Sequence, residues 1–155
     1  MHSLIKTVIG KPAQWLIDAA TSVGLDYSKL YHEITIYFLQ HVKKRHTQGN
    51  LAITEKDIKK LPVIIRNPDM AVIGAIRGKK IFNAYAKRMD EETYLYYDEV
   101  LNSNHNKALR GSTFYKIKKE LDMDGFIKII TMNRKSNVLK AKKIIAAGGH
   151  PGGEA

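Results

Sequence analysis

The sequence predicts an α+β fold, in which N-terminal helices pack on an antiparallel sheet of four or five strands and a C-terminal helix closes the domain. Apolar residues recur at helical spacing before residue 62. Runs of β-branched and aromatic residues, separated by turn formers, follow from residue 70. Helices followed by a run of strands indicate an α+β domain and not a doubly wound parallel sheet.

The helical part is expected to span residues 11–62. Its first helix starts at Pro12, because proline is well tolerated in a first turn. The second helix is capped by Asp26 or Ser28 and carries an apolar stripe to about residue 45. The third is short and ends before Pro62.

The sheet part is expected to span residues 70–133, because β-prone runs alternate there with turn formers. The end of the run at 108–117 could instead start a helix. A closing helix is expected over 137–147 and a flexible, glycine-rich tail over 148–155, so that residues 1–147 form one domain. The expected strands are 70–77, 79–88, 93–101, 108–117 and 126–132.

The composition narrows the classes of function. The chain has 26 Lys+Arg against 15 Asp+Glu, a formal net charge of +11, and no cysteine. A basic chain favours a polyanionic partner, and the lack of cysteine excludes disulfides, thiolate zinc sites and a cysteine nucleophile. No apolar run approaches the ~18–20 residues of a membrane span. We therefore expect no membrane association.

Motifs for metals and cofactors are missing from the sequence. His32-Glu33 begins like a zinc-protease motif, but Ile36 stands where the second histidine should be. There is no Walker-type phosphate loop and no dinucleotide fingerprint. We therefore expect neither a metal nor a cofactor.

The second expected helix ends in a basic segment that contains a histidine. His46 directly follows Lys43-Lys44-Arg45, beyond the last expected turn, where a side chain is accessible. A histidine exchanges a proton near neutral pH, and fixed cations polarise a phosphodiester. Cleavage of RNA through its own 2′-hydroxyl requires this combination and leaves a 2′,3′-cyclic phosphate. The same cations would also complement the dipole at a helix C-terminus, and this alternative stays open.

The order of these segments resembles the barnase/EndoU/colicin D-like (BECR-fold) ribonucleases, as found in phage polyvalent proteins and in C-terminal toxin domains of contact-dependent inhibition systems. The resemblance covers about residues 32–135 and rests on His41–His46, Thr54–Pro62, Ile65–Asp69 and the strand meander that follows. It implies helices packed on a twisted antiparallel sheet, with RNA held across the sheet. It also implies a metal-independent endoribonuclease, in several colicin D-like toxins one that cuts the anticodon loop of transfer RNA.

The resemblance also suggests site residues. Colicin D carries a Lys-x-Lys-His arrangement, which Lys43, Arg45 and His46 match with arginine in place of the second lysine. The positive charge survives that replacement. These three residues are the expected catalytic group.

Colicin D also uses a hydroxyl and an aromatic residue, two positions apart, on a late strand. Thr131 and Asn133 are one counterpart, which lacks the aromatic residue, and Thr113 and Tyr115 are the other. The choice between Thr131 and Thr113 as the catalytic hydroxyl stays open. The residues expected to bind substrate are Lys44, Arg110, Tyr115, Lys116, Asn133, Arg134 and Lys135.

Three functions are compatible with the sequence. The first is an endoribonuclease toxin that cleaves RNA, with transfer RNA as the expected substrate. It would be delivered to act in the cytoplasm of a target bacterium, and an acidic immunity protein would hold it in check. The second is a non-enzymatic RNA- or DNA-binding module, and the third is a phage structural or packaging accessory protein.

Overall fold

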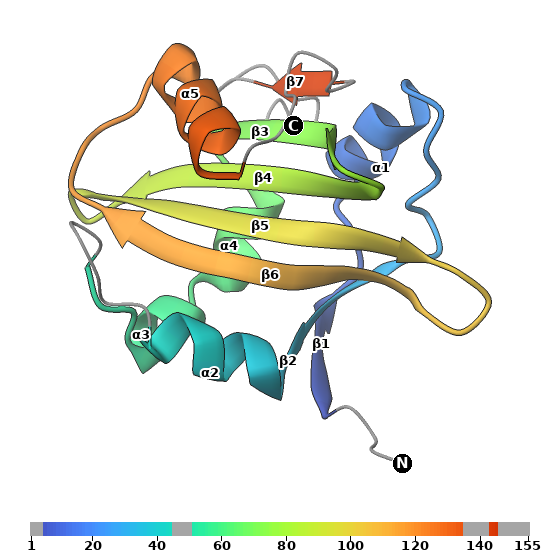
Figure 1. The fold of residues 1–155 in the computed structure, drawn as a ribbon, viewed down its shortest axis with the longest axis horizontal. Helices are drawn as coiled ribbons and strands as arrows, with labels where there is room; N and C mark the ends of the chain where they lie inside the picture. Colours follow the sequence, from blue (N-terminus) through green and yellow to red (C-terminus); the bar gives the residue numbers. More distant parts are fainter. Residues whose placement is uncertain (1–4, 45–50, 135–142, 146–155) are drawn as a thin grey trace.

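The computed structural model describes residues 5–44, 51–134 and 143–145. One seven-stranded sheet runs through them in the order β1-β2-β6-β5-β4-β3-β7 (Figure 1). The strands are β1 (Lys6–Gly10), β2 (Tyr31–Thr35), β3 (Met70–Arg77), β4 (Lys80–Met89), β5 (Glu92–Asn102), β6 (Lys107–Ile117) and β7 (Lys143–Ile145). The helices are α1 (Gln14–Thr21), α2 (Ile36–Lys44), α3 (Glu55–Ile58), α4 (Leu61–Arg66) and α5 (Met123–Arg134).

The α+β class is confirmed, and the sheet is larger than the sequence predicts. The four long strands β3 to β6 form the expected antiparallel meander. Three further strands, β1, β2 and β7, extend it at its two edges. The pairing of β2 with β6 is parallel, over Tyr31–Glu33 and Ala108–Arg110, so the sheet is not purely antiparallel.

The prediction of the second helix is confirmed only for its second half. Its first part is strand β2, and α2 begins at Ile36. Thr35 marks the change, because its hydroxyl accepts the N–H of Phe38 at 3.1 Å, as a helix N-cap does. The third expected helix corresponds to the single turn α3, and a further helix that the sequence did not predict, α4, follows it with Pro62 in its first turn.

The expected strand at 126–132 is wrong, because these residues belong to helix α5. Asp122 accepts the N–H of Gly125 at 2.8 Å and so caps the helix. Phe126 and Ile130, four residues apart, are both fully buried against the sheet. The expected closing helix at 137–147 is also wrong over Lys143–Ile145, which form β7. The remainder of that range, and the tail at 148–155, lie outside the described residues.

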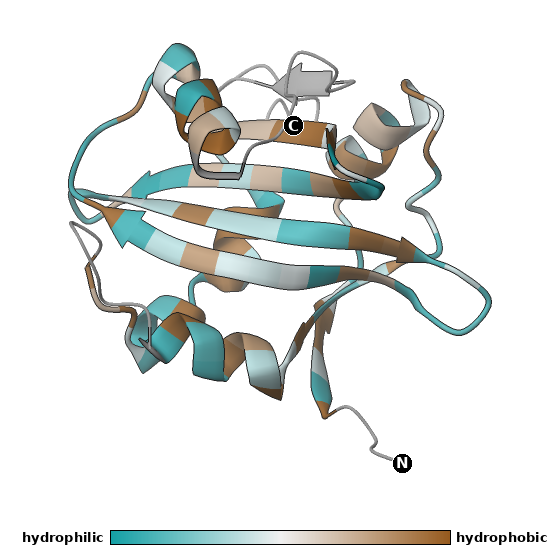
Figure 2. Ribbon diagram, in the orientation of Figure 1, coloured by the Kyte–Doolittle hydropathy of each residue, from teal (hydrophilic) through white to brown (hydrophobic). Residues whose placement is uncertain are grey.

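The sheet separates two hydrophobic cores. One core joins α1, α2 and α4 to one face of the sheet, and the hydrophobic α4 lies behind the sheet in Figure 2. The other core joins α5 to the opposite face. Tyr96 and Phe114 belong to the first core, whereas Tyr97 and Tyr115 belong to the second, as alternation along a strand requires. None of the helices in the described ranges is long and apolar enough to cross a membrane.

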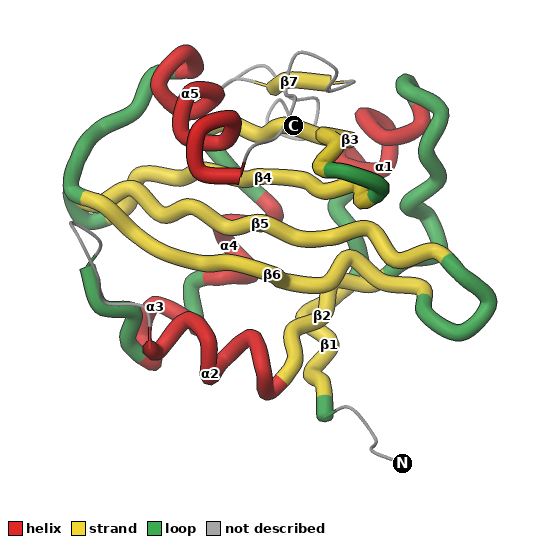
Figure 3. Tube along the Cα trace, viewed as in Figure 1, coloured by secondary structure: helices red, strands yellow, loops and turns green. Residues whose placement is uncertain are grey.

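Helix α2 runs alongside β6 beyond the end of β2 (Figure 3). Gly111 permits this close approach, because a Cβ atom there would lie 2.6 Å from Tyr96 Oη and 3.2 Å from Phe38. The C-terminal end of α2 is thereby brought toward the end of β6 that carries Lys116.

Candidate active site

A buried carboxylate, Asp57, joins helix α3 to the sheet at this end of β6. Thr54 and Asp57 form a capping box, in which each side chain accepts the backbone N–H of the other. Asp57 also accepts the hydroxyl of Tyr94 at 2.7 Å and forms an ion pair with Lys116 at 3.0 Å. Its side chain is 3 % exposed, so these bonds replace water almost entirely.

The hydrogen bonds decide the charge of Asp57. Burial alone would raise its pKa, but the bonds from Tyr94, from the backbone and side chain of Thr54 and from Lys116 lower the pKa to about 2. The group is therefore a carboxylate at neutral pH. Burial alone would lower the pKa of Lys116, but its bonds to Asp57 and Glu92 outweigh this effect and raise the pKa.

Lys60 belongs to the same cluster and is not among the residues predicted from the sequence. Its ammonium donates to the Tyr94 hydroxyl at 2.8 Å and lies 4.9 Å from the centre of the Tyr94 ring. The bond to Tyr94 and the one to Asp90 raise the pKa of Lys60. The signal that could have found it is its position three residues after Asp57, one helical turn along the chain.

Two of the predicted site lysines meet at α3. Lys43, at the end of α2, forms an exposed ion pair with Glu55 in the first turn of α3. Lys116 pairs with Asp57 and with Glu92 at 3.2 Å, and its side chain is 12 % exposed. The structure therefore brings Lys43 and Lys116 to the same short helix.

Lys43 and Lys116 also lie beside the two flanks of residues 45–50, the segment that contains Arg45 and His46. Helix α2 ends at Lys44, and the next described residue, Leu51, pairs with Lys116, its N–H donating to the Lys116 carbonyl at 3.2 Å. Arg45 and His46 lie between these points, outside the described residues. Both flanks of the expected catalytic pair are thus fixed beside the Asp57 cluster, by which we mean Asp57, Lys60, Tyr94 and Lys116.

The two candidate hydroxyls lie elsewhere. Thr113 and Tyr115 are on the face of β6 that turns toward α5, opposite Lys116. Tyr115 stacks on Tyr97, and their hydroxyls are 3.1 Å apart. Thr131 lies on α5, not on a strand, and its hydroxyl donates to the carbonyls of Ile127 and Lys128 within the helix.

The other expected substrate-binding residues are dispersed. Arg110 is held by Glu33 of β2 at 2.7 Å. Asn133 and Arg134 end α5, and Lys44 ends α2. Lys135 lies outside the described residues. Within the parts of the chain that the structure describes, no three His, Asp or Glu side chains form a group that could hold a metal ion.

Comparison with known proteins assigns the chain to a family. We found no match among curated proteins and none among solved structures. Residues 10–123, however, match the family described as phage-Barnase-EndoU-ColicinE5/D-RelE like nuclease3. The match includes the segment from Lys43 to His46, the Asp57 cluster and β6, and it ends before Thr131. The chain therefore belongs to this family of phage nucleases.

Proposed function

We propose that the protein is a metal-independent endoribonuclease that cleaves RNA by attack of its own 2′-hydroxyl, giving a 2′,3′-cyclic phosphate. His46 is the proton-transfer group, and Lys43 and Arg45 are the cations that stabilise the charge on the phosphorane. We further propose transfer RNA, cut in the anticodon loop, as the substrate.

The observation that carries this proposal is that the described residues on both sides of Arg45 and His46 are fixed. Lys43 and Leu51 are held by α3 and by β6, and Lys60 and Lys116 add two cations beside them. A general acid or base must be positioned to within hydrogen-bond reach of the reacting proton, so a histidine between two fixed flanks suits this role.

The placement of the hydroxyls favours Thr113 over Thr131. Thr113 and Tyr115 lie inside the matched residues, on a central strand. Thr131 lies beyond the match, on helix α5 and not on a strand. Of the two candidates, we therefore propose Thr113 with Tyr115 as the hydroxyl–aromatic pair.

The test is the incubation of purified protein with total transfer RNA in EDTA. We expect discrete fragments with 2′,3′-cyclic phosphate ends, and the His46→Ala variant should cleave about 10²–10⁴-fold more slowly. His105→Ala is the matched control, because His105 is exposed in the β5–β6 loop at the opposite end of these strands. Cleavage that requires a divalent ion, or a His46→Ala protein as active as the wild type, would contradict the mechanism.

A further inference from the structure

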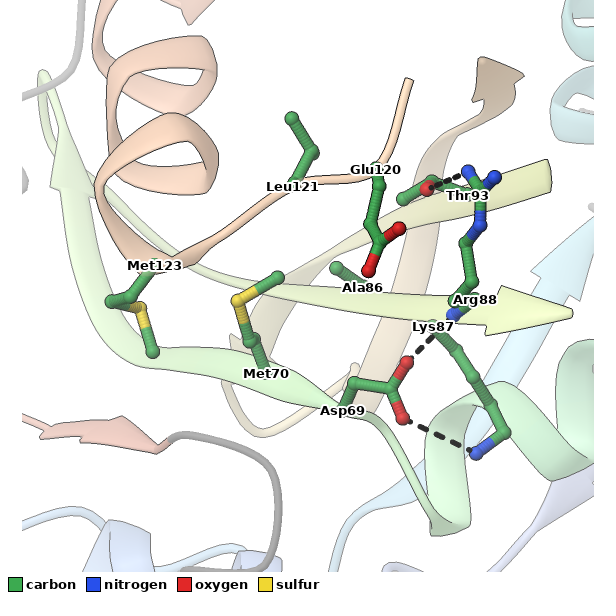
Figure 4. Close-up of a pocket in the computed structure, with 9 residues that line it drawn as sticks. All are labelled: Asp69, Met70, Ala86, Lys87, Arg88, Thr93, Glu120, Leu121 and Met123. Atoms are coloured by element: carbon green, nitrogen blue, oxygen red, sulfur yellow. Dashed lines mark hydrogen bonds and ion pairs between the residues drawn. The ribbon is translucent and has the colours of Figure 1, made fainter. Parts of the chain in front are cut away.

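A cavity lies at the same end of the sheet as the Asp57 cluster, on the face that carries α5. It is a cavity of about 350 Å³ between the ends of β3, β4 and β5 and the segment that leads into α5 (Figure 4). We call it the Arg88 cavity. Its lining residues are Asp69, Met70, Ala86, Lys87, Arg88, Thr93, Glu120, Leu121 and Met123.

The walls of the Arg88 cavity differ in chemistry. Met70, Leu121 and Met123 form an apolar side, whereas Arg88 and Thr93 lie on the other side and the Glu120 carboxylate lies between the two (Figure 4). Thioether side chains adapt to a flat surface, and a guanidinium plane can stack on one. The cavity thus offers an apolar wall for a planar ring and polar groups for its edge.

The polar side of the cavity is preorganised. Arg88 Nη1 donates to Thr93 Oγ1 at 2.9 Å and to the Lys118 carbonyl at 2.7 Å, and the backbone N–H of Arg88 donates to Asp69 at 2.7 Å. These bonds fix the guanidinium on the rigid strands β4 and β5. A ligand would therefore meet a formed site and would not have to order it.

A basic stretch of chain leads from the Asp57 cluster to the cavity. Lys116 lies in the cluster and Glu120 in the cavity, and the exposed Lys118 and Lys119 lie between them. Four residues span at most about 14 Å, a distance that single-stranded RNA covers in about two or three nucleotides. The adjacent residues Thr93 and Tyr94 also show that the two sites are close, since Thr93 lines the cavity and Tyr94 belongs to the Asp57 cluster.

We propose that the Arg88 cavity is a nucleobase subsite, which takes one unstacked base of an RNA that also contacts the Asp57 cluster. Glu120 selects the base. A carboxylate only accepts hydrogen bonds, and the one donor on the pairing edge of uracil, N3–H, lies between two carbonyl oxygens that repel a carboxylate. Glu120 therefore favours adenine, cytosine or guanine, which carry an exocyclic amino group, over uracil. This proposal rests on the proposed function, because it assumes RNA as the ligand.

The test uses the full chain and fluorescent 2′-O-methyl octamers of A, C and U, which have no free 2′-hydroxyl and so cannot be cleaved by the proposed reaction. We expect the A and C octamers to bind about fivefold more tightly than the U octamer. Glu120→Gln should bring this ratio close to one, since an amide can also donate. Leu121→Trp, which fills the cavity, should weaken binding of all three octamers.

Glu91→Gln is the matched control, because Glu91 is exposed at the same end of the sheet but does not line the cavity. It should leave the ratio between octamers unchanged. Equal binding of the three octamers, or no effect of Leu121→Trp in a variant that unfolds at the wild-type temperature, would overturn the subsite even if transfer RNA is cleaved. Discrimination between octamers without any RNA cleavage would instead overturn the proposed function and retain the subsite.

Discussion

Two aspartates, Asp57 and Asp98, are buried on the same side of the sheet and accept hydrogen bonds from different kinds of donor. Asp57 lies at the end of the strands and pairs with the ammonium groups of Lys60 and Lys116. Asp98 lies in the middle of β5, fully buried, and accepts bonds from two neutral donors, Asn83 at 2.7 Å and Tyr85 at 2.8 Å.

The hydrogen bonds of Asp98 are part of a larger network in the core. Asn83 also accepts the hydroxyl of Tyr27 and the N–H of Gly74. Burial, together with the charge of Asp98, raises the pKa of Tyr27 and of Tyr85, so both remain protonated donors. His32 lies 3.6 Å from Asp98, and neither ring nitrogen has a hydrogen-bond partner among the described residues.

The two aspartates have different roles, one in the core of the fold and the other at the proposed site. The Asp98 network joins the segment at Tyr27 to strands β3, β4 and β5 through buried hydrogen bonds from uncharged donors, which salt screens little. The Asp57 cluster joins the proposed site to the sheet through lysines that reach solvent, and RNA phosphates can compete for such cations. Stability should therefore depend most on Asp98, and sensitivity to pH and RNA most on the Asp57 cluster.

The largest effect on stability should come from Asp98→Ala. It leaves the Asn83 amide and the Tyr85 hydroxyl buried without their acceptor, at about 1–3 kcal/mol each, so we expect a loss of about 2–6 kcal/mol in the free energy of unfolding. Urea denaturation measures it. Asp98→Asn, which keeps one acceptor oxygen, should cost less, and an Asp98→Ala protein as stable as the wild type would break the comparison.

Asp57 should control acid stability. Its pKa falls from 3.8 to about 2 on folding. The corresponding stabilisation is present above the unfolded pKa and is lost as pH falls through the folded pKa, and it amounts to about 1–2 kcal/mol, since the lysines are partly solvated. The free energy of unfolding should therefore decrease between about pH 4 and pH 2. Asp57→Asn should flatten this decrease, and an unchanged pH profile would contradict the assignment.

A smaller gain should follow from Glu91→Gly. Asp90 and Glu91 form the β4–β5 turn with φ angles of 53° and 63°, and Glu91 has no ion pair among the described residues that would compensate for the strain. Glycine adopts this conformation freely but has more entropy to lose on folding, so we expect a net gain of about 0.5–1 kcal/mol. Thermal unfolding measures it, with Glu91→Ala as the control that should show no gain.

The smallest effect on stability should come from the exposed pair of Lys43 and Glu55. Neither Lys43→Ala nor Glu55→Gln should measurably change the free energy of unfolding. Their effects on RNA should oppose each other: Lys43→Ala should weaken binding, and Glu55→Gln should strengthen it by releasing Lys43. Effects in the same direction would show that Glu55 serves RNA in another way.

The sequence predicts the long antiparallel strands well because β-prone runs and turn residues coincide there. The prediction is wrong where the spacing of apolar residues indicates one structure and contacts with distant parts of the chain favour another. Leu30, Ile34 and Phe38 have helical spacing, yet residues 31–35 form a strand because β6 and β1 pair with them. Ile127, Ile129 and Thr131 favour a strand, but the cap at Asp122 and the buried pair of Phe126 and Ile130 determine a helix.

The candidate site was predictable in part. The basic segment before His46 is visible in the sequence, and so is the helix start at Thr54. The sequence does not reveal that Asp57 of that start contacts Tyr94 and Lys116, because these partners are separated from it by dozens of residues and meet only when β5 and β6 pair.

The pairing of β2 with β6 and of Leu51 with Lys116 has a consequence for biosynthesis. Both contacts join the first third of the chain to residues beyond 107. A ribosome releases the chain from its N-terminus, so Leu51 cannot pair with Lys116 until Lys116 has left the exit tunnel. Assembly of the proposed site should therefore wait until most of the chain has been made.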